Sequence, residues 1–321
     1  MDSGQVKQVL DGCLARVGQR IIGQQELVKK VFVALIAGGH VLVEGVPGIA
    51  KTLMISTISQ IAGLPFKRIQ FTPDLLPSDL TGMSVFRPDQ GKFVVEKGPV
   101  FTNVVLADEI NRAPPKVQSA LLEVMAEKQV TIFGQTFVVD RPYFVMATQN
   151  PIEQEGTYSL PEAQLDRFMF KLIMPYPNVA EETLIATHSM VQAMPAPLEP
   201  FLKIEDLKGM QERVDGIHVD DKVVGYAVDL VIATRDVERL KNMKLESAIQ
   251  WGASPRATLW LLRGARTLAM TEGRDFVTPH DVKEIAKEVL RHRLILTYEA
   301  QAEGLTPDAI VERLLKEIPS P

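Results

Sequence analysis

The chain has 321 residues and a net charge of −5, from 35 Lys and Arg against 40 Asp and Glu. Hydrophobic residues make up 46% and charged residues 23%, which excludes an intrinsically disordered protein and predicts about two globular domains. The mild negative charge gives no electrostatic footprint for a general nucleic-acid binder, and the single cysteine, Cys13, excludes a disulfide framework and a multi-cysteine zinc site.

The first residues lack the basic-then-apolar pattern of a secretory leader. The longest apolar run, Val31–Gly39, is far shorter than the ~20 residues that cross a bilayer. We therefore expect a cytoplasmic protein with no membrane insertion.

The first half of the chain alternates short apolar runs with helical patterns, which is typical of a parallel sheet covered by helices. Strands are predicted over residues 41–45, 66–71, 104–109, 143–148 and 168–174, with a helix over 51–62. Two further segments, 84–96 and 130–139, have β-type arms around turn residues. They predict hairpins that project from the α/β core.

The composition changes after Met174, where five prolines (Pro175, Pro177, Pro195, Pro197 and Pro200) fall within a short span. We place a domain boundary there, between an α/β domain of residues 1–194 and a smaller helical domain of residues 195–321. Helices are predicted over 220–235 and 255–271. Thr278 and Thr306 each precede a proline, the signature of an N-cap before the first helical position.

The segment GVPGIAKT (45–52) lies between a predicted strand and a predicted helix. Backbone N–H groups and a helix N-terminus at such a turn can bind phosphate. Lys51 would contact the β- and γ-phosphates, and Thr52 would give its hydroxyl to Mg²⁺. Ala50 stands where glycine usually precedes the lysine, and its Cβ restricts the backbone. For this loop alone, a tight turn with an exposed lysine stays an alternative.

Asp108 and Glu109 are the last residues of the predicted strand 104–109, the second strand after this loop. An acid at that position can hold the water shell of a metal ion, and its neighbour can polarise an attacking water. A solvated turn is the alternative. Their place past the loop and across an intervening strand weakens that alternative, because a phosphate-binding ATPase requires this arrangement.

Three further residues are candidates for contact with the γ-phosphate. Asn150 follows a strand and could hydrogen-bond the phosphate, although an ordinary Asn-Pro turn is the favoured explanation for this residue taken alone. Arg167 precedes a strand as a candidate arginine finger, or as a surface residue paired with Asp166. Arg256 lies in the first turn of a helix, where a cation is disfavoured, so an anionic partner or plain exposure could account for it.

Together and in this order, these elements resemble the AAA+ ATPases and, among them, the MoxR family. The segments that carry the resemblance are GVPGIAKT (45–52), LADEINRAPPKVQSALLEVMAE (106–127), ATQNP (147–151), SLPEAQLDRF (159–168) and GASPRA (252–257). The resemblance covers nearly the whole chain and accounts for Ala50, which members often carry. The hairpins at 84–96 and 130–139 resemble the helix-2 insert and the hairpin before sensor 1.

The resemblance implies a P-loop AAA+ core with a parallel sheet, followed by an all-α lid, and ATP or ADP with Mg²⁺ as cofactors. The implied nucleotide-binding residues are Gly45, Val46, Pro47, Gly48, Ile49, Ala50, Lys51, Thr52 and Leu53 of Walker A, and Ile21, Ile22, Gly23 and Gln24 beside the adenine. Walker B would comprise Asp108, a metal ligand with Thr52, and Glu109, the catalytic acid. The remaining implied roles are sensor 1 for Asn150, the arginine finger for Arg167 and sensor 2 for Arg256.

The resemblance also implies partners. Members form rings, usually hexamers, in which the finger acts on the nucleotide of a neighbouring subunit and the lid arginine acts within or across subunits. They are thought to remodel protein complexes as chaperones, often alongside proteins with von Willebrand factor A domains. We therefore predict an Mg²⁺-dependent ATPase that acts on client proteins.

Two other functions stay open at this stage. A nucleic-acid motor is disfavoured by the charge of −5 and the lack of a zinc module. A non-hydrolytic ATP-dependent switch is disfavoured because Asp108, Glu109, Asn150 and Arg167 are all present. The five histidines are scattered without metal-ligand spacing. The basic run 291–293 is expected to be a solvated face or a lid contact.

Overall fold

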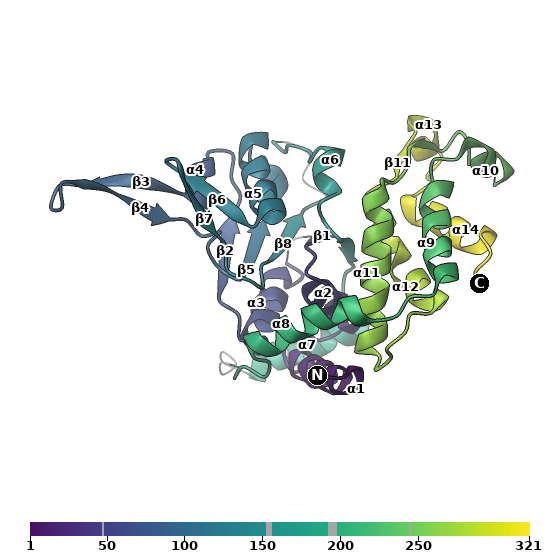
Figure 1. The fold of residues 1–321 in the computed structure, drawn as a ribbon, viewed down its shortest axis with the longest axis horizontal. Coiled ribbons are helices and arrows are strands. Elements are labelled where there is room, and N and C mark those ends of the chain that lie inside the picture. Colours follow the sequence, from purple (N-terminus) through teal and green to yellow (C-terminus); the bar gives the residue numbers. More distant parts are fainter. Residues whose placement is uncertain (47, 152–155, 192–197, 244) are drawn as a thin grey trace.

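A parallel five-stranded sheet with helices on both faces forms the first half of the protein (Figure 1). The structure, a computed structural model, describes residues 1–46, 48–151, 156–191, 198–243 and 245–321. The strands are β2 (Phe66–Gln70), β5 (Val104–Asp108), β8 (Phe144–Gln149), β1 (Val41–Gly45) and β9 (Phe170–Met174), in this spatial order. All neighbouring pairs are parallel, and the α/β prediction is confirmed.

Alternate residues of each strand point to opposite faces of the sheet, because side chains alternate along an extended backbone. Val41 and Val43 pack with α1 (Ser3–Gly18), α2 (Gln25–Ala37) and α3 (Lys51–Ile61). Leu42 packs on the other face, beneath α4 (Pro77–Thr81) and α5 (Pro115–Glu127). The core on the first face continues into the C-terminal helices, so the sheet and those helices share one hydrophobic cluster.

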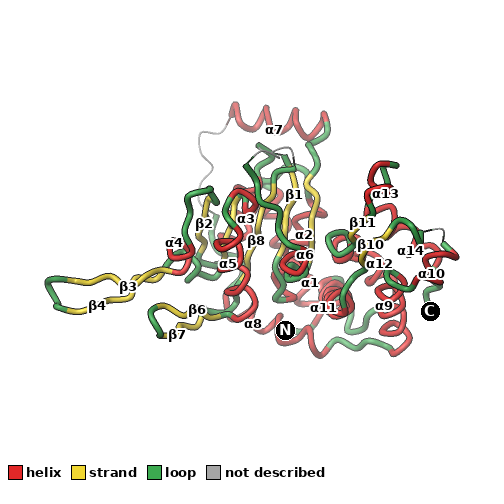
Figure 2. The backbone as a smooth tube through the Cα atoms, turned by 90° about the horizontal axis from the view of Figure 1, so that it is seen from above, coloured by secondary structure: helices red, strands yellow, loops and turns green. Residues whose placement is uncertain are grey.

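Both predicted hairpins are present and project from the same side of the sheet (Figures 1 and 2). The first consists of β3 (Gly82–Arg87) and β4 (Lys92–Lys97), paired antiparallel throughout. The second consists of β6 (Gln129–Ile132) and β7 (Gln135–Val138). Neither joins the parallel sheet, as the sequence predicted.

The second half of the chain is mostly helical. Its helices are α7 (Val179–Val191), α8 (Ile204–Arg213), α9 (Asp221–Ala233), α10 (Val237–Asn242), α11 (Pro255–Thr271), α12 (Pro279–Leu290), α13 (Tyr298–Ala302) and α14 (Pro307–Glu317), with short strands β10 (Ile249–Trp251) and β11 (Ile295–Leu296). The predicted caps are confirmed: Thr278 forms a capping box, and Thr306 accepts from the N–H of Ala309. The predicted boundary after residue 194 lies outside the described residues.

Helix α11 docks the helical part onto the core, where it lies against α1 and α2. Helix α8 also lies against α2, beneath the sheet in Figure 1. Across the described ranges, every helix is too short or too polar to cross a bilayer.

Cys13 on α1 should be inert in the folded protein. Its side chain is buried, and burial raises the pKa of the thiol to about 12. Only the thiolate is nucleophilic, so almost none of the reactive form exists at pH 8. We expect iodoacetamide to leave Cys13 unmodified in native protein at pH 8. In about 8 M urea, which unfolds a domain of this size, iodoacetamide should alkylate Cys13. The intact mass of the protein distinguishes the two outcomes. Equal rates in the two states would contradict this burial.

Candidate functional site

The loop after β1 makes the sharp turn expected of a phosphate loop. Gly48 and Ala50 have positive φ values of 85° and 60°, and Ala50 is the N-cap of α3. Lys51 is buried at the start of α3, and its Nζ donates to the Gly45 carbonyl at 2.7 Å. The left-handed backbone at Ala50 costs about 1–2 kcal/mol for a residue with a Cβ. Pro47 lies outside the described residues.

The first turn of α3 continues this loop. Thr52 is half-buried, and the Leu53 side chain is exposed. Val46 and Ile49 are half-buried within the turn itself. The loop residues therefore present backbone and the Thr52 hydroxyl at the carboxyl edge of the sheet, where β1 ends.

The two predicted acids are held by a threonine of the neighbouring strand. Asp108 ends β5, and Glu109 follows with a φ of 56°. Thr148 of β8 donates its hydroxyl to Asp108 Oδ1 at 2.6 Å and accepts from the Glu109 N–H at 2.8 Å. One side chain thus holds the carboxylate of Asp108 and the backbone of Glu109, a role that the sequence analysis did not assign.

Three more residues that the sequence analysis missed contact these acids. Arg68 donates to Asp108 Oδ2 through Nε at 3.0 Å and Nη2 at 2.7 Å. Gln70 donates to Glu109 Oε2 at 2.8 Å, and Arg112 Nε lies 3.0 Å from the same oxygen. Arg68 and Gln70 are on β2, which pairs with β5. No local pattern predicts that Arg68 contacts Asp108, because these residues are 40 positions apart in the chain.

Asn150 joins the loop and the acids at the same edge of the sheet. It is buried and directly follows β8, where Gln149 pairs with Glu44 of β1. Its position therefore lies beside Gly45, at the start of the phosphate loop. In parallel α/β sheets, the carboxyl edge is where ligands bind.

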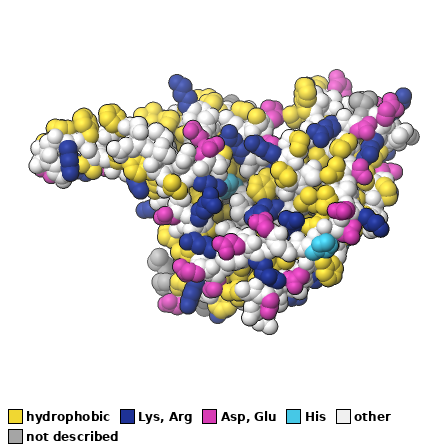
Figure 3. All heavy atoms as spheres, viewed as in Figure 1, with side chains coloured by type: hydrophobic (Ala, Val, Ile, Leu, Met, Phe, Trp, Pro, Cys, Tyr) yellow, Lys and Arg dark blue, Asp and Glu magenta, His cyan; other side chains and the backbone are white. Residues whose placement is uncertain are grey.

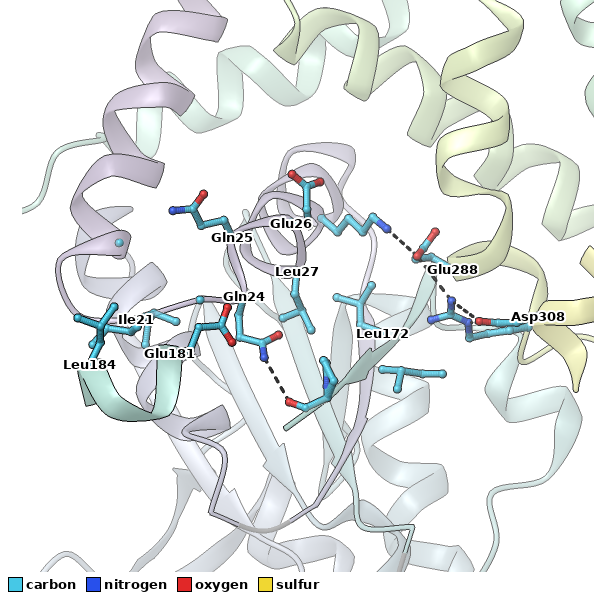
Figure 4. Close-up of a pocket in the computed structure, with 17 residues that line it drawn as sticks. Ile21, Gln24, Gln25, Glu26, Leu27, Leu172, Glu181, Leu184, Glu288 and Asp308 are labelled. Carbon is cyan, nitrogen blue, oxygen red and sulfur yellow. Dashed lines mark hydrogen bonds and ion pairs between the residues drawn. The ribbon is translucent and has the colours of Figure 1, made fainter. Parts of the chain in front are cut away.

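A cavity of about 1010 Å³ adjoins this edge (Figure 4). Ile21, Ile22, Gly23 and Gln24 all line it, together with residues at the end of β9. Gly23 has a φ of 69° and approaches Glu181 so closely that an added Cβ would lie 2.5 Å from the carboxyl carbon. Gln24 Nε2 donates to the Pro175 carbonyl at 3.2 Å. The structure therefore brings the predicted adenine segment onto one cavity wall.

The opposite wall of this cavity comes from the C-terminal helices. Lys30 of α2 forms an ion pair with Glu288 of α12 at 2.7 Å. Arg291 lies 3.6 Å from Glu288 and 2.8 Å from Asp308 of α14, and it donates to the Lys171 carbonyl of β9. Figure 4 shows Glu288 and Asp308 on the side of the cavity away from Ile21 and Glu181. The cavity thus lies between the core and the helical part.

The two predicted arginines lie together, in a different place. Arg167 and Arg256 line a cleft of about 300 Å³ with Asp166 and Lys128. Arg167 Nη1 donates to the Leu122 carbonyl at 2.6 Å, and Arg256 Nη1 lies 3.7 Å from Asp166 Oδ2. Lys and Arg side chains gather in the hollow middle of this face, between the core and α11 (Figure 3).

Lys128 is a cation in this cleft that the sequence analysis did not single out. It ends α5 with a φ of 55°, and its Nζ lies 2.8 Å from His40 Nε2. Burial, with a smaller contribution from Arg141, lowers the pKa of Lys128 to about 8. Burial also holds the pKa of His40 well below its usual range, so this histidine is a neutral structural residue. Among the described residues, no acidic, histidine or cysteine cluster could hold a metal ion by itself.

The register of the sheet shows that the phosphate loop and Arg167 lie at opposite edges of the sheet. Phe170, at the start of β9, pairs with Val41, and Met174 pairs with Gly45. Arg167 therefore precedes the amino edge, whereas the phosphate loop leaves the carboxyl edge. The strand between them is about 15 Å long at ~3.3 Å per residue. The loop, the two acids and Asn150 form one site, and the two arginines lie apart from it.

Comparisons with known proteins agree with this geometry. Residues 40–170 match the family described as "ATPase family associated with various cellular activities (AAA)", and residues 242–314 match "AAA lid domain". The chain is 47% identical to "Chaperone MoxR1" of Mycobacterium tuberculosis, covering 97% of this chain and 82% of that protein. It is 31% identical to "Protein MoxR" of Paracoccus denitrificans, covering 94% and 93%.

A solved structure is similar over its whole length. The crystal structure of a candidate ATPase from Cytophaga hutchinsonii superposes with a TM-score of 0.93 at 42% identity, covering 99% of this chain and 97% of that one. The fold and the carboxyl-edge site define an AAA+ protein with a helical lid. The chain belongs to the MoxR family of AAA+ ATPases.

Replacing Ala50 with glycine should stabilise the protein. Glycine adopts the φ of 60° found at this position without steric cost. The relief of left-handed strain exceeds the added chain entropy of glycine, so we expect a gain of about 1 kcal/mol. Urea denaturation measures it. Ala62→Gly at the C-cap of α3, where φ is −77°, is the matched control and should destabilise. A loss of stability in Ala50→Gly would contradict the strained turn.

Proposed function

We propose that this protein hydrolyses ATP at sites shared between neighbouring copies in a ring, and uses this cycle to remodel protein complexes. The observation that carries the proposal is the separation of the phosphate loop from Arg167 and Arg256. Groups about a strand length apart cannot contact one phosphate within a subunit. Head-to-tail packing, in which one carboxyl edge faces the next amino edge, closes into a ring when the rotation between copies divides a full turn. A hexamer is the ring size implied by the family.

The carboxyl edge holds the nucleotide in this proposal. Residues 45–53 surround the phosphates with the Lys51 ammonium and with the backbone N–H groups that all of them except Pro47 carry. Residues 21–24 contact the adenine in the adjoining cavity. The Thr52 hydroxyl and the Asp108 carboxylate are oxygen donors at this edge and suit Mg²⁺, which takes few protein ligands beside phosphate. When bound, Mg²⁺ neutralises charge on the phosphates.

Catalysis then depends on positioning and charge. Glu109, oriented through Thr148, polarises the attacking water, and Asn150 hydrogen-bonds the γ-phosphate. Arg167 of the next copy stabilises the charge that develops on the transferred phosphoryl group. Arg256 shares a cleft with Arg167, which supports action across the same interface rather than within its own subunit.

The hairpins supply a surface for client proteins. Phe86 and Phe93 of the first hairpin and Phe133 of the second are 50%, 62% and 78% exposed. The rings of Phe93 and Phe133 stack with centroids 5.9 Å apart, so the two hairpins present one apolar cluster. Exposed aromatic clusters of this kind mark protein contacts. Together with the relative named as a chaperone, this supports protein clients. We include partners with von Willebrand factor A domains in the proposal only because the family resemblance implies them.

Changing Glu109 to Gln should abolish turnover and leave ATP binding intact. The amide keeps the shape of the side chain but cannot polarise water, so we expect phosphate release to fall by about 10²–10⁴-fold. Binding of ATP with Mg²⁺, measured by calorimetry, should change little. Glu123→Gln, on the exposed face of α5, is the matched control and should retain full turnover. Unchanged turnover in Glu109→Gln would refute the assignment.

Mixing two inactive variants should restore activity if the site is shared. Arg167→Ala subunits keep an intact phosphate loop, and Lys51→Ala subunits keep an intact finger. Mixed rings therefore contain some complete interfaces, and phosphate release should rise above that of either variant alone. Lys51→Ala mixed with Glu109→Gln is the control, because both lesions lie at the same edge, and it should stay inactive. Failure of the first mixture at every ratio would count against the shared site.

A further inference from the structure

Arg293, three residues after the end of α12, makes several polar contacts between the lid and the core. Its Nε donates to Asp166 Oδ1 at 2.7 Å, and its Nη2 donates to the carbonyls of Asp166 at 3.0 Å and Phe168 at 2.7 Å. Its Nη1 donates to the carbonyls of Met169, at 3.4 Å, and Val289. The sequence analysis expected this basic run to be a solvated face or a lid contact. It is a lid contact, and Arg293 is buried rather than solvated.

Asp166 and Phe168, which accept these hydrogen bonds, are the residues on either side of Arg167 in the chain. We propose that Arg293 and Asp166 are positioning residues, through which the lid holds Arg167 and Arg256 in place for the nucleotide of the neighbouring copy. This inference rests on the proposed function, because it assigns these two arginines to the shared site. Arg293 itself touches neither the nucleotide edge nor the phosphate loop among the contacts described.

Asp166 joins three separate segments. One oxygen accepts from Arg293, and the other accepts from Ser254 Oγ at 2.9 Å and lies 3.7 Å from Arg256 Nη1. Ser254 caps α11, and its Oγ accepts from the N–H of Arg256 at 3.2 Å. A single carboxylate therefore links the finger segment, the start of α11 and the end of α12.

Electrostatics requires such a carboxylate here. Arg167, Arg256 and Lys128 line one cleft, and Asp166 is the acid that lines it with them. Burial lowers the pKa of Arg293 to about 10, with Arg256 contributing and Asp166 opposing, so Arg293 stays charged at neutral pH. Asp166 therefore allows guanidinium groups to lie close together that would otherwise repel one another.

The two residues before Arg293 contact the same stretch of the core, which runs from Asp166 into β9. Buried His292 has its Nε2 3.1 Å from the Phe168 carbonyl. Arg291 donates to the Lys171 carbonyl at 2.9 Å. Three consecutive lid residues thus bind backbone from Asp166 to Lys171. A rotation of the lid must move this segment or break these bonds, so the orientation of the lid is coupled to the backbone that carries Arg167. The Arg167 side chain then extends from that backbone to the Leu122 carbonyl of α5.

The test is Arg293→Lys in the full-length chain. Lysine keeps the charge but cannot serve the Asp166 carboxylate and two backbone carbonyls with a planar set of donors. A displaced finger should lower kcat by about 100-fold. KM for ATP should stay within about twofold, because the variant keeps its own phosphate loop. A loss of kcat/KM that comes equally from a lower kcat and a higher KM would overturn the proposal.

Subunit mixing separates positioning from general damage. Arg293→Lys mixed with Lys51→Ala should regain activity, because the finger of the second variant serves the loop of the first. Arg293→Lys mixed with Arg167→Ala should not, because both lack a working finger. Restoration by both or by neither would overturn the positioning role. Inactivity of the Arg167→Ala and Lys51→Ala mixture would instead refute the proposed function itself.

Matched variants guard against simple destabilisation. Arg274→Lys changes another Arg–Asp pair, within the lid, in which a half-buried arginine contacts the buried Asp281 at 2.6–2.9 Å. It should lose stability without the selective loss of kcat, and an equal loss of kcat would overturn the proposal. If Arg293→Lys does not fold, Asp166→Asn and the milder Ser254→Ala give the same mixing assay. Each should be restored by Lys51→Ala and not by Arg167→Ala, and the reverse would contradict the inference.

Discussion

The shared direction of the five strands is the constraint on which the rest of the molecule depends. In a parallel sheet, every strand delivers its carboxyl end to one edge and its amino end to the other. The phosphate loop, Asp108, Glu109 and Asn150 all follow strands and meet at the first edge. Arg167 precedes a strand and lies at the second. An active site that uses both sets of residues needs two copies of the chain, whatever the conformation of the lid.

Backbone strain is concentrated where function is proposed. Five non-glycine residues in the described part of the chain have positive φ: Gln24, Ala50, Glu109, Lys128 and Phe133. The first three lie at the carboxyl edge or its adjoining cavity, and Lys128 lies in the arginine cleft. Such conformations cost free energy and persist only where surrounding packing enforces them. The apolar neighbours of Gln24 and Ala50 belong to the hydrophobic cluster shared by sheet and lid, and those of Glu109 and Lys128 belong to the cluster on the other face of the sheet.

The end of α12 contacts the core at both of these places. Glu288 and Arg291 border the cavity at the carboxyl edge, and Arg293 binds the segment before β9 at the other edge. One short stretch of the lid therefore touches both halves of the proposed site. Because one short stretch of the lid makes both sets of contacts, a movement of the lid that breaks the contacts at one edge of the sheet also disturbs those at the other edge.

The sequence by itself determined the strands, both hairpins, the helix caps and the turn between β1 and α3 that we propose binds phosphate. These depend on residue alternation, turn residues and side chains within a few positions of each other, which are local. Only the tertiary structure decided that Arg68 and Gln70 face the acids, that Arg167 and Arg256 share a cleft, and that Arg293 is buried on Asp166. Strand order and lid docking follow from packing between segments 40 to 130 positions apart, roughly, and no local pattern records them.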